Sequence, residues 1–237
     1  MSGRRLAAGV NEETMASYDN RLFLRRVPLF GGLSEAQIDL LAVGSQRKSF
    51  SRGKTIVAEG EVSQTLFIML SGRAKVQRSD SEGKEVILAV IGSGEFFGEM
   101  SLIDDEPRSA SVITLEACEL LSIRKENFLA ILNQSPETCL AVMHGLVRRL
   151  RSADRKIETL ALLDVYGRVA RVLLESSEVV DGQRVVRNRL PRQQIAKMVG
   201  ASREMVSRVM KGLETEGYIA PLAEGRILLR EKLGLYV

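Results

Sequence analysis

Residues 96–112, FFGEMSLIDDEPRSASV, carry the densest pattern of chemically specific side chains in this 237-residue chain. Gly98 allows close approach of a ligand to the backbone, because glycine has no Cβ. Arg108 offers a planar pair of donors that fits a phosphate, and Ser109 adds a hydroxyl donor. Glu99 accepts hydrogen bonds when ionised, which suits a ribose hydroxyl. The stretch therefore predicts a pocket for sugar and phosphate together, since a mere Glu99–Arg108 salt bridge would leave the glycine and serine spacing unexplained.

Short apolar runs surround this stretch between Lys48 and Arg124. They are rich in Val, Ile, Leu and Phe, are punctuated by glycines, and read TIVAEG, TLFIMLSG, AKVQRS, EVILAVIG, SASVIT and CELLSI. Many short strands at roughly 8 to 12 residue spacing predict a small antiparallel barrel or sandwich. Residues 81–83, Ser-Glu-Gly, predict a hairpin turn between two of the strands. We expect a jelly-roll-like β-barrel domain over residues 21–134, preceded by a flexible polar tail over residues 1–20.

A helical period flanks the strands on both sides. Ser34 and Gln37 have the spacing of a capping box, which predicts a short helix up to Val43. Ser135 is expected to cap a long helix that begins at Pro136. Apolar residues then recur at intervals of three and four, the spacing of a heptad seam: Met143, Leu146, Leu150, Ala153, Ile157 and Leu160.

The rest of the long helix is strongly charged. This favours a dimer seam over an ordinary amphipathic helix that lies on the barrel. Residues 163–167, LDVYG, interrupt the heptads, so we place a hinge there. Residues 135–164 are therefore expected to form a dimerisation helix with its hinge, which implies a homodimer.

The last third of the chain is basic. Residues 165–237 hold 13 Lys and Arg against 8 Asp and Glu, whereas residues 1–164 hold 21 against 22. This asymmetry favours a polyanion partner such as nucleic acid. Residues 190–214, LPRQQIAKMVGASREMVSRVMKGLE, predict two helices joined by a tight turn at Gly200, with Ser202 as the cap of the second helix.

The second predicted helix carries a row of polar side chains on its solvent face. Arg203, Ser207 and Lys211 are spaced by four residues, with Glu204 and Arg208 in the adjacent row. Such groups can hydrogen-bond base edges and phosphates in a major groove. The alternative is a helical hairpin with a wet charged face. Residues 216–219, EGYI, and 223–231, AEGRILLRE, then predict two short strands joined by a turn at Glu224 and Gly225, the wing of a winged helix-turn-helix domain over residues 165–237.

Several classes of function have little support. Cys118 and Cys139 lack a metal-binding spacing, and His144 is the only histidine, so we expect no metal site and no histidine-based catalysis. The longest stretch without a charged residue has 11 residues, which is too short for a membrane helix. The start of the chain does not have the pattern of a secretory signal. We therefore expect a cytoplasmic protein that is not an enzyme, of mixed α+β class.

The stretch from Gly98 to Ser109 resembles the phosphate-binding cassette of cyclic-nucleotide-binding domains. The resemblance implies that Gly98 and Glu99 hold the ribose and that Arg108 and Ser109 hold the cyclic phosphate. The implied cyclic-nucleotide site consists of Gly98, Glu99, Met100, Ser101, Arg108, Ser109, Ala110, Ala153 and Asp154.

The base-reading part of this site departs from the family pattern. The Thr-Ser pair that meets adenine in the catabolite activator proteins corresponds to Ala153 and Asp154 here. The Asp154 carboxylate could accept hydrogen bonds from guanine or from the adenine amino group, or could pair with Arg151 or Arg155 on the helix surface. Cyclic AMP is the typical effector of the family, and cyclic GMP and cyclic di-GMP remain alternatives.

Residues 202–208, Ser-Arg-Glu-x-x-x-Arg, resemble the recognition helix of the CRP/FNR regulators. In the catabolite activator subgroup this pattern reads a TGTGA-like half-site, which implies Arg203, Glu204 and Arg208. The implied DNA-contacting residues are Arg192, Gln193, Ser202, Arg203, Glu204, Ser207, Arg208 and Lys211. Pro191 stands where relatives often have a hydroxyl that caps the preceding helix.

The order barrel, long helix, winged helix-turn-helix resembles that family over residues 25–230. It implies an allosteric, nucleotide-responsive regulator of transcription that binds double-stranded DNA, with RNA polymerase contacted by the segment from Glu175 to Arg184, which we read as a loop. Two alternatives remain open. One is a ligand-independent DNA binder with a vestigial barrel, and the other is a regulatory subunit of an enzyme.

Overall fold

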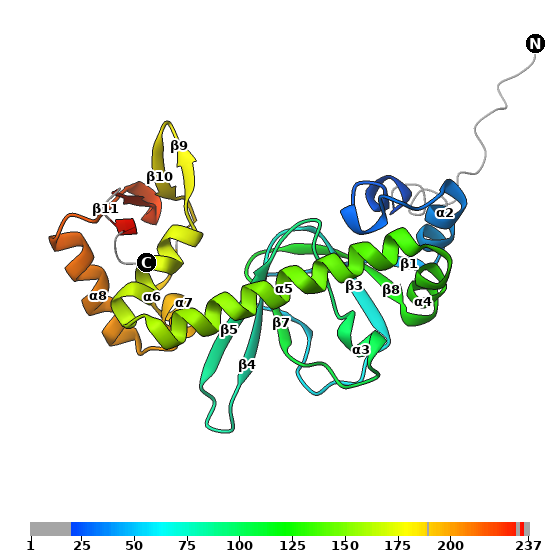
Figure 1. The fold of residues 1–237 in the computed structure, drawn as a ribbon, viewed down its shortest axis with the longest axis horizontal. Helices are drawn as coiled ribbons and strands as arrows, with labels where there is room; N and C mark the ends of the chain where they lie inside the picture. Colours follow the sequence, from blue (N-terminus) through cyan, green and yellow to red (C-terminus); the bar gives the residue numbers. More distant parts are fainter. Residues whose placement is uncertain (1–19, 189, 231–232, 235–237) are drawn as a thin grey trace, which may run out of the picture. The chain divides into compact units, whose positions relative to one another are not determined.

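The computed structural model describes residues 20–188, 190–230 and 233–234. The chain forms two compact units (Figure 1). The first holds residues up to 78 together with 89–147, and the second holds residues 79–88 together with those from 148 onward. Our expectation of a tail falls outside the described residues, except at Asn20. Asn20 is buried, and its side-chain amide donates to the Ser45 hydroxyl at 3.2 Å.

Two four-stranded antiparallel sheets confirm the predicted jelly-roll class of the first unit. The first sheet has the order β1 (Ser45–Phe50), β8 (Cys118–Arg124), β3 (Thr65–Ser71), β6 (Phe96–Phe97). The second has the order β2 (Thr55–Val57), β7 (Ser111–Thr114), β4 (Ala74–Ser79), β5 (Glu85–Ile91). The six predicted runs correspond to β2, β3, β4, β5, β7 and β8. Polar β1 and two-residue β6 lacked a distinct apolar pattern of their own.

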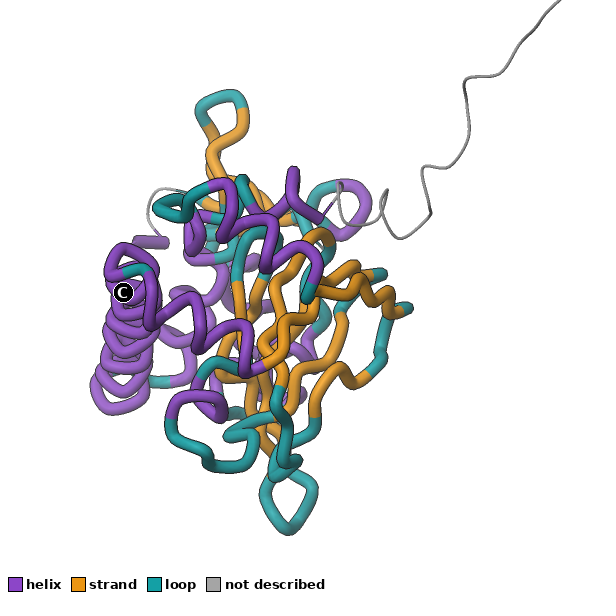
Figure 2. Tube along the Cα trace, turned by 90° about the vertical axis from the view of Figure 1, so that its right-hand side faces the viewer, coloured by secondary structure: helices purple, strands orange, loops and turns teal. Residues whose placement is uncertain are grey.

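Strand β3 is buried on both faces, which is why its sequence reads as a continuous apolar run. Leu66 and Ile68 pack in a cluster with residues of the helices, whereas Phe67 and Met69 pack in a second cluster with residues of both sheets. Phe67 stacks on Phe97 of β6 with ring centroids 5.3 Å apart. The first sheet therefore has an apolar cluster on each of its faces. Figure 2 shows the strands of the protein in orange.

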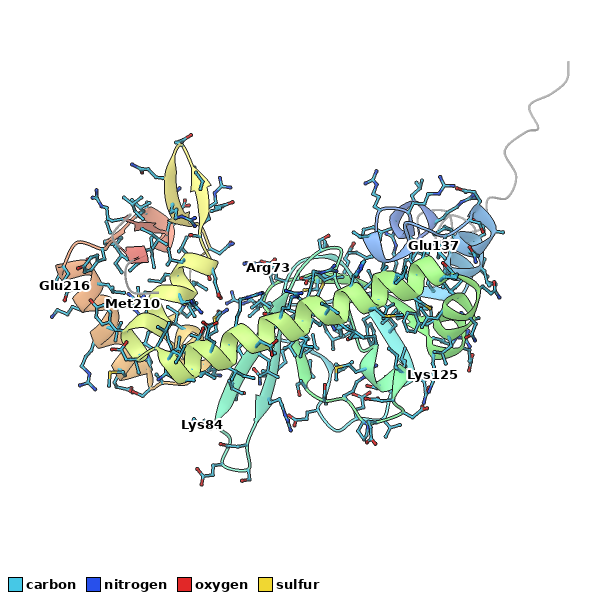
Figure 3. All side chains as sticks on the ribbon, in the orientation of Figure 1. Arg73, Lys84, Lys125, Glu137, Met210 and Glu216 are labelled. Atoms are coloured by element: carbon cyan, nitrogen blue, oxygen red, sulfur yellow. The ribbon has the colours of Figure 1, made fainter. Side chains whose placement is uncertain are left out.

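Helices cover the Leu66 side of this sheet. They are α2 (Glu35–Val43), α4 (Lys125–Gln134) and the start of α5 (Pro136–Leu162), with a 3-10 turn, η1, at Pro28–Phe30. The predicted capping box is present, since the Ser34 hydroxyl accepts from the Gln37 backbone N–H and the Gln37 side chain accepts from that of Ser34. The predicted cap of α5 is also present, because the Ser135 hydroxyl accepts from the Thr138 backbone N–H at 3.1 Å. Figure 3 marks this first turn of α5 by its label on Glu137.

The second unit contains the DNA-binding class of fold that the sequence predicts. Its helices are α6 (Val165–Glu175), α7 (Arg192–Val199) and α8 (Arg203–Thr215). Its sheet has the order β11 (Ile219–Pro221), β12 (Ile227–Leu229), β10 (Gln183–Val186), β9 (Glu178–Val180), with the 3-10 turn η2 at Ala223–Gly225. Helix α5 ends at Leu162, and the Asp164 carboxylate caps α6 by accepting from the Gly167 N–H at 2.9 Å.

Our expectation of a loop from Glu175 to Arg184 was wrong. Strands β9 and β10 form a hairpin there, which extends the predicted two-stranded wing to four strands. Asp181 and Gly182 form the turn with φ of 49° and 76°. Positive φ at both central residues is typical of the tight turn that joins two antiparallel strands, and Asp-Gly is its usual sequence. That dipeptide was the signal the sequence interpretation missed.

A piece of the β4–β5 hairpin belongs to the second unit. Glu85 of β5 forms an ion pair with Lys197 of α7, and the Lys156 ammonium of α5 donates to the Leu88 carbonyl. Burial lowers the pKa of Lys156, with the charge of Glu175 acting in the opposite direction. The residues from Ser79 to Leu88 are therefore held by lysines of the helical unit.

Candidate functional site

The predicted cassette forms a loop, a short helix and a second loop after strand β6. The helix, α3, spans Met100–Ile103 beside β3 (Figure 1). Glu99 is its N-cap, and the Glu99 carbonyl accepts from the Leu102 N–H at 3.0 Å. Gly98 has a φ of +87°, and a Cβ at this position would lie 2.2 Å from Nη1 of Arg108. Both the backbone and the available space therefore require glycine at Gly98.

The Arg108 side chain is 4% exposed and lies in a cradle of oxygen acceptors. Its Nη1 donates to the Gly98 carbonyl at 2.7 Å and is 3.4 Å from the Ser101 hydroxyl. Its Nη2 donates to the Ser63 hydroxyl at 2.8 Å and to the Thr65 carbonyl. These acceptors belong to separate segments of the first unit, so the guanidinium joins the cassette to the start of β3.

The Arg108 guanidinium is buried without a carboxylate at ion-pair distance among the described residues. Within the described residues the guanidinium forms no ion pair, and its Nε is buried without a hydrogen-bond acceptor. Burial lowers the pKa of Arg108, while the charges of Glu61 and Glu99 act to raise it. A buried cation is costly unless it is paired. The site is therefore suited to an anion that would supply both the charge and the acceptor.

The other cassette residues divide into a buried group and an exposed group. Glu99, Ser101 and Ala110 are buried, and Glu99 is only 1% exposed. Met100 and Ser109 are exposed, with the Ser109 hydroxyl 4.0 Å from the Met100 sulfur. The structure thus brings together Gly98, Ser101 and Arg108 by hydrogen bonds and leaves the Ser109 hydroxyl accessible to a ligand.

The two predicted base-reading residues lie in the second unit. Ala153 and Asp154 are exposed on the part of α5 that follows Val147. The cassette belongs to the first unit. Neither unit by itself brings these residues to the cassette.

The predicted seam on α5 is mostly exposed. Met143, Leu150, Ala153, Ile157 and Leu160 are accessible, and Ile157 is 65% exposed. Leu146 instead is half-buried and packs against the core of the first unit. Leu140 and Val147, which the heptad pattern did not include, are exposed apolar residues of the same helix. The exposed apolar surface is therefore wider than the predicted stripe.

The helix-turn-helix has the predicted local geometry. Gly200 ends α7 in the left-handed conformation, with φ 67° and ψ 38°. The Ser202 hydroxyl caps α8 by accepting from the Met205 N–H at 3.1 Å. The inner faces, including Met210 of α8 (Figure 3), are buried as expected; they comprise Ile195, Ala196, Val199, Val206, Val209 and Met210.

The polar face of α8 is open to solvent. All of its predicted DNA-contacting residues are exposed: Ser202, Arg203, Glu204, Ser207, Arg208 and Lys211. A hydrogen bond to its own backbone N–H and one to the Ser202 hydroxyl lower the pKa of the Glu204 carboxyl, with smaller contributions from Arg203 and Arg208. The carboxylate therefore stays ionised and able to accept a hydrogen bond.

The start of α7 is less strongly fixed. Pro191 occupies the N-cap position and provides no side-chain cap. Arg192 is half-buried and Gln193 is exposed in the first turn. At the other end of α7, Arg168 of α6 donates to the Val199 carbonyl at 2.9 Å. This contact fixes α6 against the helix-turn-helix, and the sequence analysis missed it.

Ser63 and Thr65 were also missed, although both contact Arg108. Ser63 lies in the loop between β2 and β3, and Thr65 is the first residue of β3. The loop shows no motif of its own, and contacts with Arg108 across more than 40 residues leave no periodic signal in the sequence. Metal ions require sets of ligands that lie close together. In the part of the chain that the structure describes, no group of three or more His, Cys, Asp or Glu residues could hold a metal ion. Of the described helices, none is both long and apolar enough to cross a membrane.

Family models match both units of the chain. A cyclic nucleotide-binding domain matches residues 47–135, and a Crp-like helix-turn-helix domain matches residues 167–236. A cyclic AMP receptor protein of Thermus thermophilus is 36% identical over 204 residues, covering 86% of this chain and 93% of the relative. The chain belongs to the CRP/FNR family of transcription regulators.

Other CRP/FNR proteins match over most of their length. The cAMP-activated global transcriptional regulator CRP of Haemophilus influenzae is 37% identical over 172 residues, covering 70% of this chain and 75% of that protein. A solved structure of the c-di-GMP responsive global regulator CLP of Xanthomonas campestris has a TM-score of 0.71 and 29% identity, covering 83% of this chain and 99% of that one. This chain is accordingly a cyclic-nucleotide-responsive, DNA-binding transcription regulator.

Proposed function

We propose that the effector is a cyclic nucleotide whose phosphate binds at Arg108. The observation that carries this proposal is the buried guanidinium, whose Nε has no hydrogen-bond acceptor among the described residues. The cyclic phosphate supplies a negative charge and several acceptor oxygens, so its binding removes the cost of burying Arg108. Ser109 donates its exposed hydroxyl to the same phosphate. Gly98 and Glu99 bind the ribose, with Met100, Ser101 and Ala110 completing the cassette.

We assign the reading of the base to Asp154, beside Ala153. A carboxylate accepts from the N1–H and amino group of guanine or from the amino group of adenine. The relatives named for cyclic AMP favour that ligand, whereas the relative named for cyclic di-GMP favours a larger one. Calorimetric titration of the full chain with cyclic AMP, cyclic GMP and cyclic di-GMP distinguishes these effectors, and repeating it on Asp154→Ala tests the base reader. Heat from none of the three would support the ligand-independent alternative.

The DNA site that we propose is a TGTGA-like palindrome. Arg203 and Arg208 would bind guanine, Glu204 would accept from the cytosine amino group, and the remaining polar residues of the two helices would contact phosphates. The exposed α8 face and the positive charge of residues 165–237 support this assignment. A shift assay on duplexes with single base-pair changes tests it, because base contacts lose affinity only at their own positions.

A homodimer would place two such helices on the two half-sites, one DNA turn apart. We propose that it forms along the exposed apolar residues of α5, which a monomer would leave in water. Sedimentation of the wild type and of Ile157→Glu tests this assembly. The wild type is expected to sediment as a dimer and the variant as a monomer.

The remaining assignments complete the regulator. We propose the division into residues 21–134, 135–164 and 165–237 as sensor, dimer helix with hinge, and reader. We assign the exposed β9–β10 hairpin to contact with RNA polymerase, and the cytoplasm as the place of action. The effector would shift the dimer from one conformation to another only if it binds the two conformations with different affinities.

A further inference from the structure

A loop outside the cassette fixes the orientation of Arg108. The loop joins β2 to β3 and runs from Ala58 to Gln64. Its Gly60 N–H donates to the Arg108 carbonyl at 2.8 Å, and the Arg108 N–H donates to the Glu61 carbonyl at 2.9 Å. This reciprocal backbone pair holds the loop against the residue that carries the guanidinium.

Ser63 extends this contact from the backbone to the side chain. Its hydroxyl accepts from Nη2 of Arg108 at 2.8 Å, where the Thr65 carbonyl is the second acceptor on the same arm, while the Gly98 carbonyl accepts from Nη1. A guanidinium is fixed in its plane when every N–H on both arms has an acceptor, whereas an arm that keeps only one of its two acceptors can tilt. With both arms held, Nε is the donor that remains without a protein partner.

We propose that Ser63 is a positioning residue for the phosphate site. It holds the guanidinium plane so that Nε faces the ligand's phosphate, and it acts through Arg108. This inference rests on the proposed cyclic-nucleotide function and adds the β2–β3 loop to the determinants of that site. Its chemical consequence is selectivity between the two exocyclic oxygens of the cyclic phosphate, because an oriented donor does not treat them alike.

The test measures binding of cyclic AMP, cyclic GMP and cyclic di-GMP to the full chain by calorimetry, and then of the phosphorothioate diastereomers of the nucleotide that binds. In each diastereomer sulfur replaces a different exocyclic oxygen. Ser63→Ala removes the hydroxyl, Ser63→Thr restores it, and Gln64→Ala is the matched control in the exposed neighbouring position. Thermal unfolding of each variant reports on the fold.

We expect Ser63→Ala to weaken binding of the preferred nucleotide about tenfold, as for loss of one hydrogen bond to a charged group. The ratio of affinities for the two diastereomers is expected to fall toward one. Ser63→Thr should restore both quantities, and Gln64→Ala should leave both at the wild-type values. A structural role alone would lower the unfolding temperature without changing that ratio.

Two results would overturn the inference and are distinguishable. If the wild type binds a cyclic nucleotide and Ser63→Ala keeps its affinity and diastereomer ratio, Ser63 has no positioning role, while the proposed function stands. If the wild type binds none of the nucleotides, the proposed function fails and the inference fails with it.

Discussion

Arginine serves both ends of this protein, but in opposite physical settings. Arg108 of the cassette is 4% exposed and held by acceptors of the protein, whereas Arg203 and Arg208 of α8 are exposed to solvent. Arg108 loses its hydration and takes up a fixed orientation when the protein folds. A small anion would therefore meet a hydrogen-bond donor that is already in place. In the proposed complex the α8 arginines would lose their hydration only when DNA binds. On the proposed function, the sensor therefore uses preorganisation for one small ligand, while the reader uses accessible charge for a long polyanion.

Arg108→Leu should have the largest effect on the sensor side. Removing the only buried cation of the cassette is expected to weaken cyclic-nucleotide binding by at least about 100-fold, as for a broken buried charge pair of about 3–5 kcal/mol. Calorimetry measures this loss. Arg52→Leu, which changes an exposed arginine of the same unit, is the control. Wild-type affinity in Arg108→Leu would show that the phosphate binds elsewhere.

Gly98→Ala should unfold more easily than Gly94→Ala. The two glycines have φ of +87° and +83°, but a Cβ meets Arg108 only at Gly98 and open space at Gly94. The shared backbone strain costs about 1 kcal/mol each, and the clash at Gly98 adds a further loss of about 1–3 kcal/mol. Denaturant unfolding of both variants isolates the clash. Equal losses would mean that Arg108 does not occupy the position described.

Arg203→Ala should cost about 1–3 kcal/mol of DNA-binding free energy at one base pair. Lys211→Ala should instead weaken binding to all sequences alike and reduce the salt slope by about one. Fluorescence anisotropy on a set of half-site variants separates the two patterns. A uniform loss for Arg203→Ala would indicate that this arginine contacts only phosphate.

The smallest expected effect is the pH response of Glu204. Because its pKa is lowered from 4.5 in the folded state, its ionised form stabilises α8 above that pH, and the contribution is lost as the pH falls through the folded value. NMR titration of the Glu204 side chain should give a midpoint below 4.5 in the wild type. The midpoint should move toward 4.5 in Ser202→Ala, which lacks the hydroxyl bond. An unshifted midpoint in the wild type would remove the proposed cap geometry.

Local patterns were enough to predict the fold class, the caps at Ser34, Ser135 and Ser202, and the left-handed turn at Gly200. Each depends on residues within a few positions of one another. The sequence predicts Arg108 as a phosphate ligand, which stays a prediction; its inward cradle was not predictable, because its acceptors Ser63 and Thr65 are more than 40 residues away in sequence. Hairpin β9–β10 carried one local signal, the Asp181-Gly182 turn, but its three- and four-residue strands are too short to add a clear alternating pattern to it.

Leu146 shows a limit of heptad counting. The pattern gives it the same weight as Leu150, yet Leu146 packs against the barrel core and Leu150 is 62% exposed. A helix that serves both a core and a second surface carries two overlapping apolar stripes. The spacing of apolar residues in the sequence shows the two stripes together. Only the packing in the structure shows which residue belongs to which stripe.

The central claim is that an anion bound at Arg108 controls DNA binding by α8. It is tested most directly by DNA affinity in fluorescence anisotropy, measured with and without cyclic nucleotide for the wild type and Arg108→Leu. The account predicts that at least one cyclic nucleotide changes the affinity of the wild type, while Arg108→Leu keeps the nucleotide-free affinity and shows no change on addition. An unchanged response in Arg108→Leu, or no response of the wild type to any cyclic nucleotide, would contradict it.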